Sequence, residues 1–119
     1  MASFRFAGQG IRTAWRSQRN LRVQVAITLV VLVVGVWLSL DVLRWAVLVL
    51  TMGLVLGMEL VNSAIEALGD AVTVEDHPLV AQANDAAAGA VLLVALAAVV
   101  VGLFILGPPL WQRLVNPVY

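Results

Sequence analysis

The chain has 119 residues, of which 62% are hydrophobic, and its mean hydropathy of +1.00 is typical of an integral membrane protein and excludes an ordinary soluble domain. Seven basic and seven acidic residues cancel to a net charge of zero, and the lack of cysteine excludes disulfides and thiolate metal sites. The charges are segregated: five arginines crowd the first 22 residues, and six acidic residues lie between positions 59 and 85. We treat residues 1–119 as a single domain.

The first predicted element is an amphipathic helix over about residues 3–20. Its apolar residues recur at three- and four-residue spacing, and most of its arginines face elsewhere (Phe4, Ala7, Gly8, Ile11 and Trp15 against Arg5, Arg12, Arg16 and Arg19). We expect this helix to lie on the membrane surface with its arginines toward anionic headgroups. A cleaved signal peptide is not expected, because the apolar run that follows is too long and begins too late.

Three membrane-spanning helices are predicted next, over about residues 23–40, 45–68 and 86–107, so the fold class is an all-α membrane protein. The first span holds 18 uncharged residues, or roughly 27 Å of helix, close to the hydrocarbon thickness. A turn around residues 39–43 is short enough to make the first two spans antiparallel. The third span is rich in Ala and Val, and Gly107-Pro108-Pro109 is expected to close it.

The arginines predict the orientation of these spans. Five precede the first span, whereas Arg44 lies in the turn after it and Arg113 follows the third span. The positive-inside tendency therefore places the N-terminus and residues 69–84 in the cytoplasm and the C-terminus outside. The acidic segment would thus face ATP and magnesium.

One narrow face of the second span carries five polar residues, Glu59, Asn62, Ser63, Glu66 and Asp70. A charge in hydrocarbon costs at least a few kcal/mol and is rarely kept without a partner or a function. Counted from Trp45 at the outer boundary, Glu59 lies about 21 Å deep and Glu66 about 31 Å deep in a core of about 30 Å. Glu59 could then reach a hydroxyl at the head of a lipid, and Glu66 could hold a cation that touches a soluble nucleotide. Structural pairing with a neighbouring helix and ion transport remain open alternatives.

Beyond this face, Glu75-Asp76-His77-Pro78 is expected to form a cytoplasmic loop, and Asn84-Asp85 to open the third span. Asp85 near a helix start is also a reasonable capping residue, so a purely structural role is the alternative for it. The sequence contains no glycine-rich phosphate loop, so nucleotide binding would rely on a carboxylate-held metal. Mg²⁺ is the cation that such oxygens suit.

Several of these motifs resemble the small bacterial diacylglycerol kinase and undecaprenol kinase family. The most specific is the run from Glu59 to Glu66, followed by Asp70, His77-Pro78-Leu79 and residues 85–91; residues 10–15 and 18–20 fit the same pattern. The resemblance covers nearly the whole chain. It implies a homotrimer of three-span subunits with shared active sites, which phosphorylates a lipid alcohol, undecaprenol or diacylglycerol, from Mg-ATP at the bacterial cytoplasmic membrane. Nucleic acid is not among the expected partners.

The resemblance also assigns roles to single residues. Glu59 would be the catalytic base, taking the proton from the lipid hydroxyl, and Glu66 would hold Mg²⁺ against the ATP phosphates, with Gln18 at a second metal position. The residues expected to contact ATP are Gln18, Glu66, Glu75, Asp76, His77, Asn84 and Asp85. Those expected to contact the lipid are Arg12, Trp15, Asn20, Glu59 and Ala88, and those expected to support the site are Asn62 and Asp70.

Two positions depart from the family pattern. Gln18 stands where many relatives carry a metal-binding glutamate, and Asn84 stands where they carry a lysine. The lost charges could lower metal affinity or rate by one or more tenfold steps, at about 1.36 kcal/mol each. A weakened or silent membrane scaffold of the same fold is therefore the alternative function. A proton- or cation-coupled transporter is disfavoured because the acidic groups cluster on one side of the bilayer. Ala88 favours the undecaprenol branch, because serine tends to occupy that position in the diacylglycerol branch.

Overall fold

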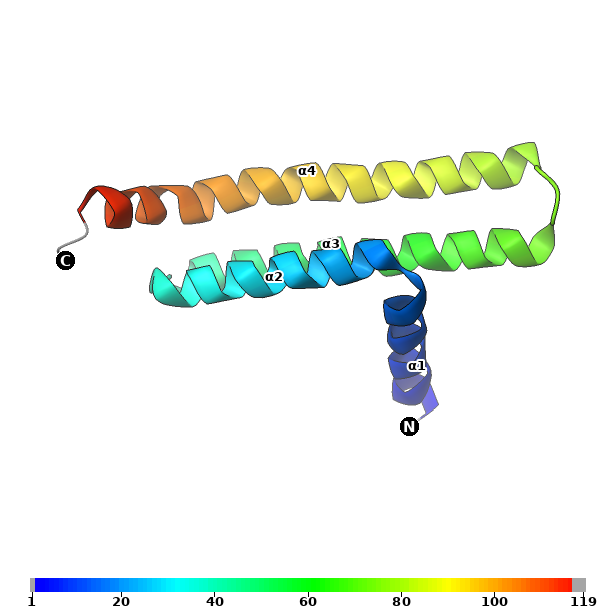
Figure 1. Ribbon diagram of the computed structural model, residues 1–119, viewed down its shortest axis with the longest axis horizontal. Coiled ribbons are helices and arrows are strands. Elements are labelled where there is room, and N and C mark those ends of the chain that lie inside the picture. Colours follow the sequence, from blue (N-terminus) through cyan, green and yellow to red (C-terminus); the bar gives the residue numbers. More distant parts are fainter. Residues whose placement is uncertain (1, 117–119) are drawn as a thin grey trace.

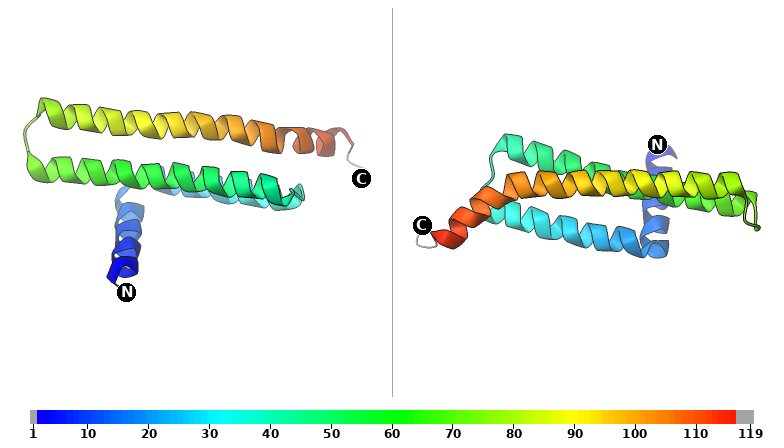
Figure 2. Two further views of the ribbon diagram at one scale, coloured as in Figure 1. Left: turned by 180° about the vertical axis from the view of Figure 1, so that it is seen from behind. Right: turned by 90° about the horizontal axis from the view of Figure 1, so that it is seen from above.

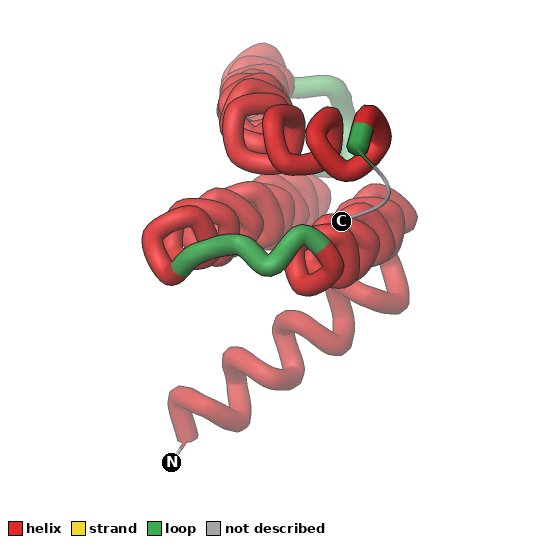
Figure 3. The backbone as a smooth tube through the Cα atoms, turned by 90° about the vertical axis from the view of Figure 1, so that its left-hand side faces the viewer, coloured by secondary structure: helices red, strands yellow, loops and turns green. Residues whose placement is uncertain are grey.

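The computed structural model describes residues 2–116, and these residues form four α-helices. They are α1 (Ala2–Ser17), α2 (Arg19–Trp37), α3 (Val42–Val72) and α4 (Pro78–Val115). The last three run side by side along the long axis of the molecule, and α1 leaves them at a steep angle (Figure 1). Seen end-on, α2 and α3 lie beside each other beneath α4 (Figure 3). The prediction of an all-α chain with three long apolar helices is confirmed.

The outer surface of α2, α3 and α4 is apolar. All three helices are long and hydrophobic enough to cross a membrane. Large side chains such as Val33, Leu50 and Phe104 are each at least two-thirds exposed, whereas Leu48 alone is fully buried among the described residues. Because water would penalise so large an apolar surface, this shell suits a hydrocarbon solvent or other apolar helices.

A single residue, Gln18, separates α1 from α2 and has an extended backbone conformation. The bend is held by Arg22, whose Nη1 donates to the carbonyl oxygen of Trp15 at 2.7 Å and to that of Arg16 at 3.2 Å. These carbonyls belong to the last turn of α1, where they have no partner within the helix. The guanidinium of Arg22 therefore supplies the hydrogen bonds that allow the chain to turn sharply.

The turn between α2 and α3 covers residues 38–41, slightly earlier than the predicted 39–43. Ser39 adopts a left-handed conformation with φ of 56°, and the Asp41 side chain caps α3 by accepting the N–H of Arg44 at 2.9 Å. Next to this turn, α2 and α3 pack closely against each other. A Cβ atom added at Gly35 would lie 2.8 Å from the Trp45 ring, so only glycine leaves room for that ring.

The start of α4 differs from the prediction. The helix begins at Pro78, and the Nδ1 atom of His77 caps it by accepting the N–H of Leu79 at 3.1 Å. Proline at the first helical position is preorganised for a helix, so the start falls about two turns before Asp85. The expectation that Asn84 and Asp85 open this helix, with Asp85 as its cap, is therefore wrong.

The end of α4 also differs from the prediction. The helix continues through Pro108 and Pro109 to Val115, and its axis bends near this end (Figure 2). Each proline removes one backbone donor, which bends a helix without always ending it. The guanidinium of Arg113 lies 5.3 Å from the centroid of the Trp37 ring, a cation–π contact that ties the extended end of α4 to the end of α2.

Candidate functional site

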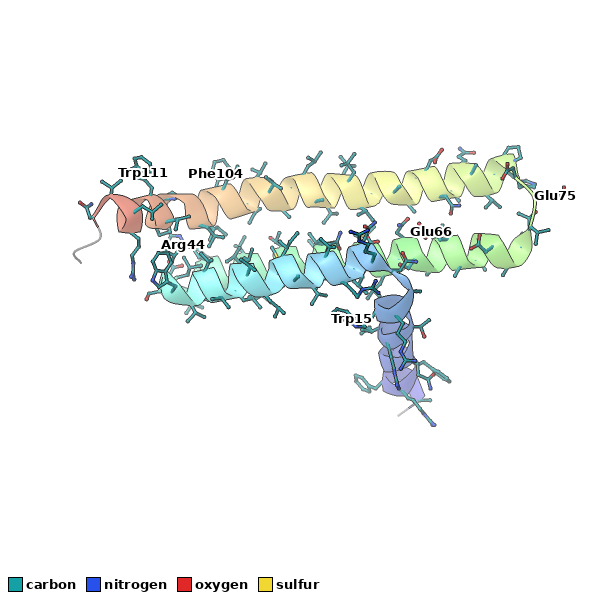
Figure 4. The ribbon with its side chains drawn as sticks, in the orientation of Figure 1. Trp15, Arg44, Glu66, Glu75, Phe104 and Trp111 are labelled. Carbon is teal, nitrogen blue, oxygen red and sulfur yellow. The ribbon has the colours of Figure 1, made fainter. Side chains whose placement is uncertain are left out.

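A cavity of about 720 Å³ lies between α1 and α3, beside the joint that leads into α2. Gln18 lines it from that joint, and Ser63, Glu66 and Asp70 line it from α3. Figure 4 shows Glu66 on α3 near the place where α1 meets the long helices. The cavity thus collects two carboxylates and one carboxamide at one end of an otherwise apolar bundle.

The carboxylate of Glu66 is oriented by its own helix. The Nδ2 atom of Asn62, one turn earlier, donates to Glu66 Oε1 at 3.3 Å. The Oδ1 atom of Asn62 is buried and has no donor among the described residues. Because the hydrogen bond occupies one carboxylate oxygen of Glu66, the other oxygen remains available to bind a cation.

Glu59 lies deeper in the bundle and is buried, with 3% of its surface exposed. Gln24 on α2 is a second polar side chain in this part of the bundle, and its buried Oε1 atom has no donor among the described residues. Gln24 was missed in the sequence. The available signal was a carboxamide side chain within residues 23–37, a run that is otherwise apolar except for Thr28. A carboxylate that is almost fully buried in an apolar helix bundle is a strong candidate for a functional group.

Other predicted nucleotide contacts lie on the opposite face of α3. A second cavity of about 430 Å³ lies between α3 and α4 and is lined by Gly69, His77 and Asn84 among others. At 100° per residue, the α3 residues lining this cavity face away from those lining the α1 cavity. The structure therefore separates His77 and Asn84 from Gln18 and Glu66 within one chain.

The remaining predicted residues lie on the surface of the single chain. Glu75 and Asp76 are exposed in the loop between α3 and α4, and Figure 4 shows Glu75 at the far end of the bundle. Asp85 is exposed on α4. The predicted lipid contacts Arg12, Trp15, Asn20 and Ala88 are exposed too, and none of them lines the cavity that holds Glu66.

The donor set at the α1 cavity fits a weakly coordinated magnesium ion. Among residues 2–116 there is no group of three or more His, Asp or Glu residues that could enclose a metal. Mg²⁺ does not require such a cage, because it commonly takes one or two carboxylates together with water and substrate phosphates. Glu66 and Asp70 supply carboxylates, and Gln18 can add a neutral oxygen.

Comparison with known proteins gives consistent results over most of the chain. The family model described as prokaryotic diacylglycerol kinase matches residues 5–106. The undecaprenol kinase of Bacillus subtilis is 39% identical over 108 residues, covering 91% of this chain and 88% of that protein. The diacylglycerol kinase of a Synechocystis species is 41% identical over 116 residues, covering 97% and 66%. The diacylglycerol kinase of Escherichia coli K12 is 33% identical over 95 residues, covering 80% and 78%.

Proposed function

The chain belongs to the prokaryotic diacylglycerol kinase family and is a lipid kinase of the membrane. We propose that it transfers the γ-phosphate of ATP to the hydroxyl of undecaprenol or diacylglycerol. The observation that carries this proposal is the arrangement of Glu59 and Glu66 on α3. One carboxylate is buried among apolar helices, and the other lines a cavity two turns away. This arrangement suits transfer of a phosphoryl group from a soluble nucleotide to a lipid.

Glu59 is the proposed base. The lipid hydroxyl loses its proton to the Glu59 carboxylate while its oxygen forms a bond to the γ-phosphorus, and the bond from that phosphorus to the β-phosphate oxygen of ADP breaks. Little covalent chemistry falls to the protein in such a transfer, because positioning and charge stabilisation supply most of the rate. Burial supports this role, since a carboxylate shielded from water is reserved for a hydroxyl that arrives with the lipid.

Glu66 is the proposed ligand of Mg²⁺, with Asp70 as a supporting carboxylate and Gln18 as a neutral oxygen donor. Bound Mg²⁺ would neutralise charge on the ATP phosphates. Asn62 keeps one oxygen of Glu66 in place through its 3.3 Å hydrogen bond. The other proposed nucleotide contacts are Glu75, Asp76, His77, Asn84 and Asp85.

We propose that the active site is shared between subunits of a homotrimer. Glu66 and Asn84 line cavities on opposite faces of α3, so one bound ATP does not reach both within a single chain. A neighbouring copy can bring the second group to the first. The exposed apolar side chains of α3, such as Leu50 and Leu54, supply surface on which such copies can pack.

We propose that α1 lies on the cytoplasmic surface of the bacterial membrane, with the N-terminus inside and the C-terminus outside. Phe4 and Ile11 are more than half exposed and would enter the lipid interface. The end of α3 and the start of α4 continue past the level of α1 (Figure 1), which suits a nucleotide-binding region in the cytoplasm. Arg12, Trp15 and Asn20, and Ala88 on α4, are the proposed lipid contacts.

A panel of lipid alcohols tests the function. Purified protein in bilayers is supplied with Mg-ATP carrying a radiolabelled γ-phosphate and with undecaprenol, diacylglycerol or a simple long-chain alcohol in turn. We expect label in the lipid phosphate of at least one of the first two, and the preferred alcohol identifies the substrate. If no alcohol acquires label while the protein remains folded, a silent scaffold of the same fold replaces the kinase.

A further inference from the structure

Two adjoining cavities lie at the end of the bundle remote from Glu66, and no part of the proposed mechanism uses them. Figure 3 looks onto this end of the molecule. The larger cavity, of about 390 Å³, is lined in part by Arg113 and Asn116 near the end of α4. The smaller, of about 270 Å³, lies between α4 and the turn that joins α2 to α3. Leu38 and Pro109 line both cavities, so together they form one recess.

Arg113 is held at this recess by a contact between two helices. The last turns of α4, beyond its bend, reach the end of α2, where the Arg113 guanidinium lies 5.3 Å from the centroid of the Trp37 ring (Figure 2). The Arg113 side chain is half-buried there. An arginine held against an aromatic ring keeps the N–H groups at its edges free to donate hydrogen bonds. These donors are therefore available to a ligand in the larger cavity.

No acidic side chain in the described part of the chain neutralises Arg113. Asp41, the acidic residue at this end, forms a 3.1 Å salt bridge with Arg44, which is the only one among the described residues. The next acidic residue along α3 is Glu59, about 27 Å beyond Asp41 at 1.5 Å per residue. Along α4, Asp85 lies about 42 Å before Arg113. The described residues at this end therefore carry one net positive charge, and it belongs to Arg113.

Three of the four tryptophans lie at the same end and mark its depth in the membrane. Trp37 ends α2, Trp45 lies in the first turn of α3, and Trp111 lies near the end of α4. Figure 4 shows Trp111 at this end of the bundle, together with Arg44. Tryptophan is enriched where a membrane meets water, with its ring at the level of the lipid headgroups. The unpaired charge of the recess is therefore expected at the level of lipid phosphates.

An exposed apolar track leads away from the recess along α2. Val33 and Val30 precede Trp37 by four and seven residues, so they share its face of the helix. Their exposed fractions are 68% and 62%. A ligand whose phosphate reaches Arg113 can lay a hydrocarbon chain along these two side chains, whereas a free phosphate ion gains nothing from them. The track therefore favours a lipid over a soluble anion.

We propose that this recess binds the phosphate of an anionic membrane lipid through Arg113, which Trp37 holds in place. The planar guanidinium fork matches phosphate oxygens, and its charge strengthens the hydrogen bonds. The carboxamide of Asn116 can donate a further hydrogen bond, and one acyl chain lies along Val33 and Val30. The recess is at the opposite end of the bundle from the proposed catalytic carboxylates, so the bound lipid is a structural ligand and not the substrate.

The test counts bound lipids by native mass spectrometry. Delipidated protein in a neutral detergent is titrated with phosphatidylglycerol, and Arg113→Gln, which removes the charge, is compared with the wild type. We expect each wild-type subunit to retain one more lipid than the variant, whose dissociation constant at this site should rise by about tenfold. Any lipid held by the arginines of α1 is retained by both proteins and cancels in the comparison. Equal lipid counts would overturn the proposal.

Trp37→Leu tests whether the ring holds the arginine. Without the ring the guanidinium is free to rotate, so the dissociation constant for phosphatidylglycerol should rise by about threefold in the wild-type background. In the Arg113→Gln background the same change should have no effect, because no cation is left to hold. Equal effects in both backgrounds would contradict the proposed pairing of Trp37 with Arg113.

The matched control is the double variant Asp41→Asn, Arg44→Gln. It removes an arginine that lines the smaller cavity without changing the net charge of this end. Asparagine is as good a cap for α3 as aspartate, so the fold is preserved. The affinity for phosphatidylglycerol should stay within about twofold of the wild type. A tenfold loss in this control would mean that the recess depends on Arg44 and not on Arg113 alone, which overturns the proposal.

Inorganic phosphate distinguishes a lipid from a soluble anion. An excess of phosphate ion, added at constant ionic strength, should leave the bound phosphatidylglycerol in place, because the ion makes no contact with the apolar track. Displacement of the lipid would identify a site for free phosphate and overturn the assignment. The lipid counts require no phosphoryl transfer, so failure of the proposed kinase activity leaves this inference standing, and equal lipid counts leave the proposed function standing.

Discussion

At the scale of single residues, the buried state of Glu59 carries the most chemical information. It is the only buried polar or charged residue among the described residues, with 3% of its surface exposed. A structural ion pair would need a cationic partner, and the only salt bridge among the described residues joins Arg44 to Asp41 at the other end of α3. The structural alternative for Glu59, pairing with an arginine of a neighbouring helix, thus finds no support within the described chain.

Glu59→Gln is expected to abolish lipid phosphorylation. Glutamine has nearly the same shape but cannot accept the hydroxyl proton, so kcat should fall by about 10²- to 10⁴-fold, the usual contribution of general base catalysis. The assay is transfer of labelled phosphate to the lipid, and circular dichroism in detergent verifies that helix content is unchanged. Retention of more than a tenth of wild-type kcat would exclude Glu59 as the base.

Gln18→Glu is expected to strengthen metal binding. Gln18 lines the same cavity as Glu66 and Asp70, so a third carboxylate there adds a charged ligand for Mg²⁺. The Mg²⁺ concentration that gives half-maximal activity should fall by about tenfold, or about 1.4 kcal/mol of binding free energy. Gln112→Glu, the same change at an exposed position near the end of α4, is a comparison in which this concentration should change little. An unchanged Mg²⁺ requirement in the Gln18 variant would remove residue 18 from the metal site.

At the scale of secondary-structure elements, the contact between α3 and α4 positions the second cavity. A Cβ atom added at Gly69 would lie 2.8 Å from the Cγ1 atom of Val80, which is closer than such atoms approach in folded proteins. Valine has one strongly preferred rotamer in a helix, so it cannot rotate out of the way. The two helices can approach this closely only because residue 69 is glycine.

Gly69→Ala is therefore expected to destabilise the protein, although alanine favours helix by about 1 kcal/mol. Overpacking costs about 1–3 kcal/mol, so the clash should outweigh the helix propensity and lower the midpoint of thermal unfolding in detergent. Removing the opposing methyl groups should restore it, so the double variant Gly69→Ala, Val80→Ala should unfold at a higher temperature than Gly69→Ala alone. A Gly69→Ala protein as stable as the wild type would show that the helices separate easily.

The sequence predicted the number and order of the long helices, because hydropathy over about 20 residues is a strong signal. It failed at both ends of α4. The helix starts at Pro78, where proline at the first helical position is itself a starting signal, and not at the polar pair Asn84-Asp85. At Pro108 and Pro109 the prolines were expected to end a helix that in fact continues to Val115. A stabilising contact such as that between Arg113 and Trp37 joins residues distant in the sequence, and hydropathy cannot reveal it.

At the scale of the whole molecule, the two groups of predicted nucleotide contacts bear on assembly. Spacing along α3 correctly suggested that Glu66 and Asp70 lie together, because both line the α1 cavity. Spacing could not indicate that Asn84 lies across α3 from them, since that depends on which face of α3 meets α4.

Mixing two inactive variants tests the shared site. Glu66→Gln and Asp85→Asn should each inactivate the protein when present in every subunit. If each site takes Glu66 from one chain and Asp85 from its neighbour, random trimers of an equal mixture should recover roughly a quarter of wild-type activity, because one neighbouring pair in four carries both native residues.

The control mixture combines Glu66→Gln with the double variant Glu66→Gln, Asp85→Asn. No chain in it supplies Glu66, so activity should stay at the background level. An equal mixture of the two single variants that also remains inactive would place both residues of each site in the same subunit.

The sharp joint at Gln18 has a consequence for how the protein responds to its bilayer. Arg22 fixes the direction of α1 relative to α2 through two hydrogen bonds, so the two helices are joined without slack. Under the proposal that α1 is anchored among the headgroups, the depth of Glu59 would be set by the protein itself and would not adjust to acyl-chain length. Hydrophobic mismatch would then be absorbed at the opposite leaflet, where the bent end of α4 would lie, and the proposed base would keep its depth in thin and thick membranes.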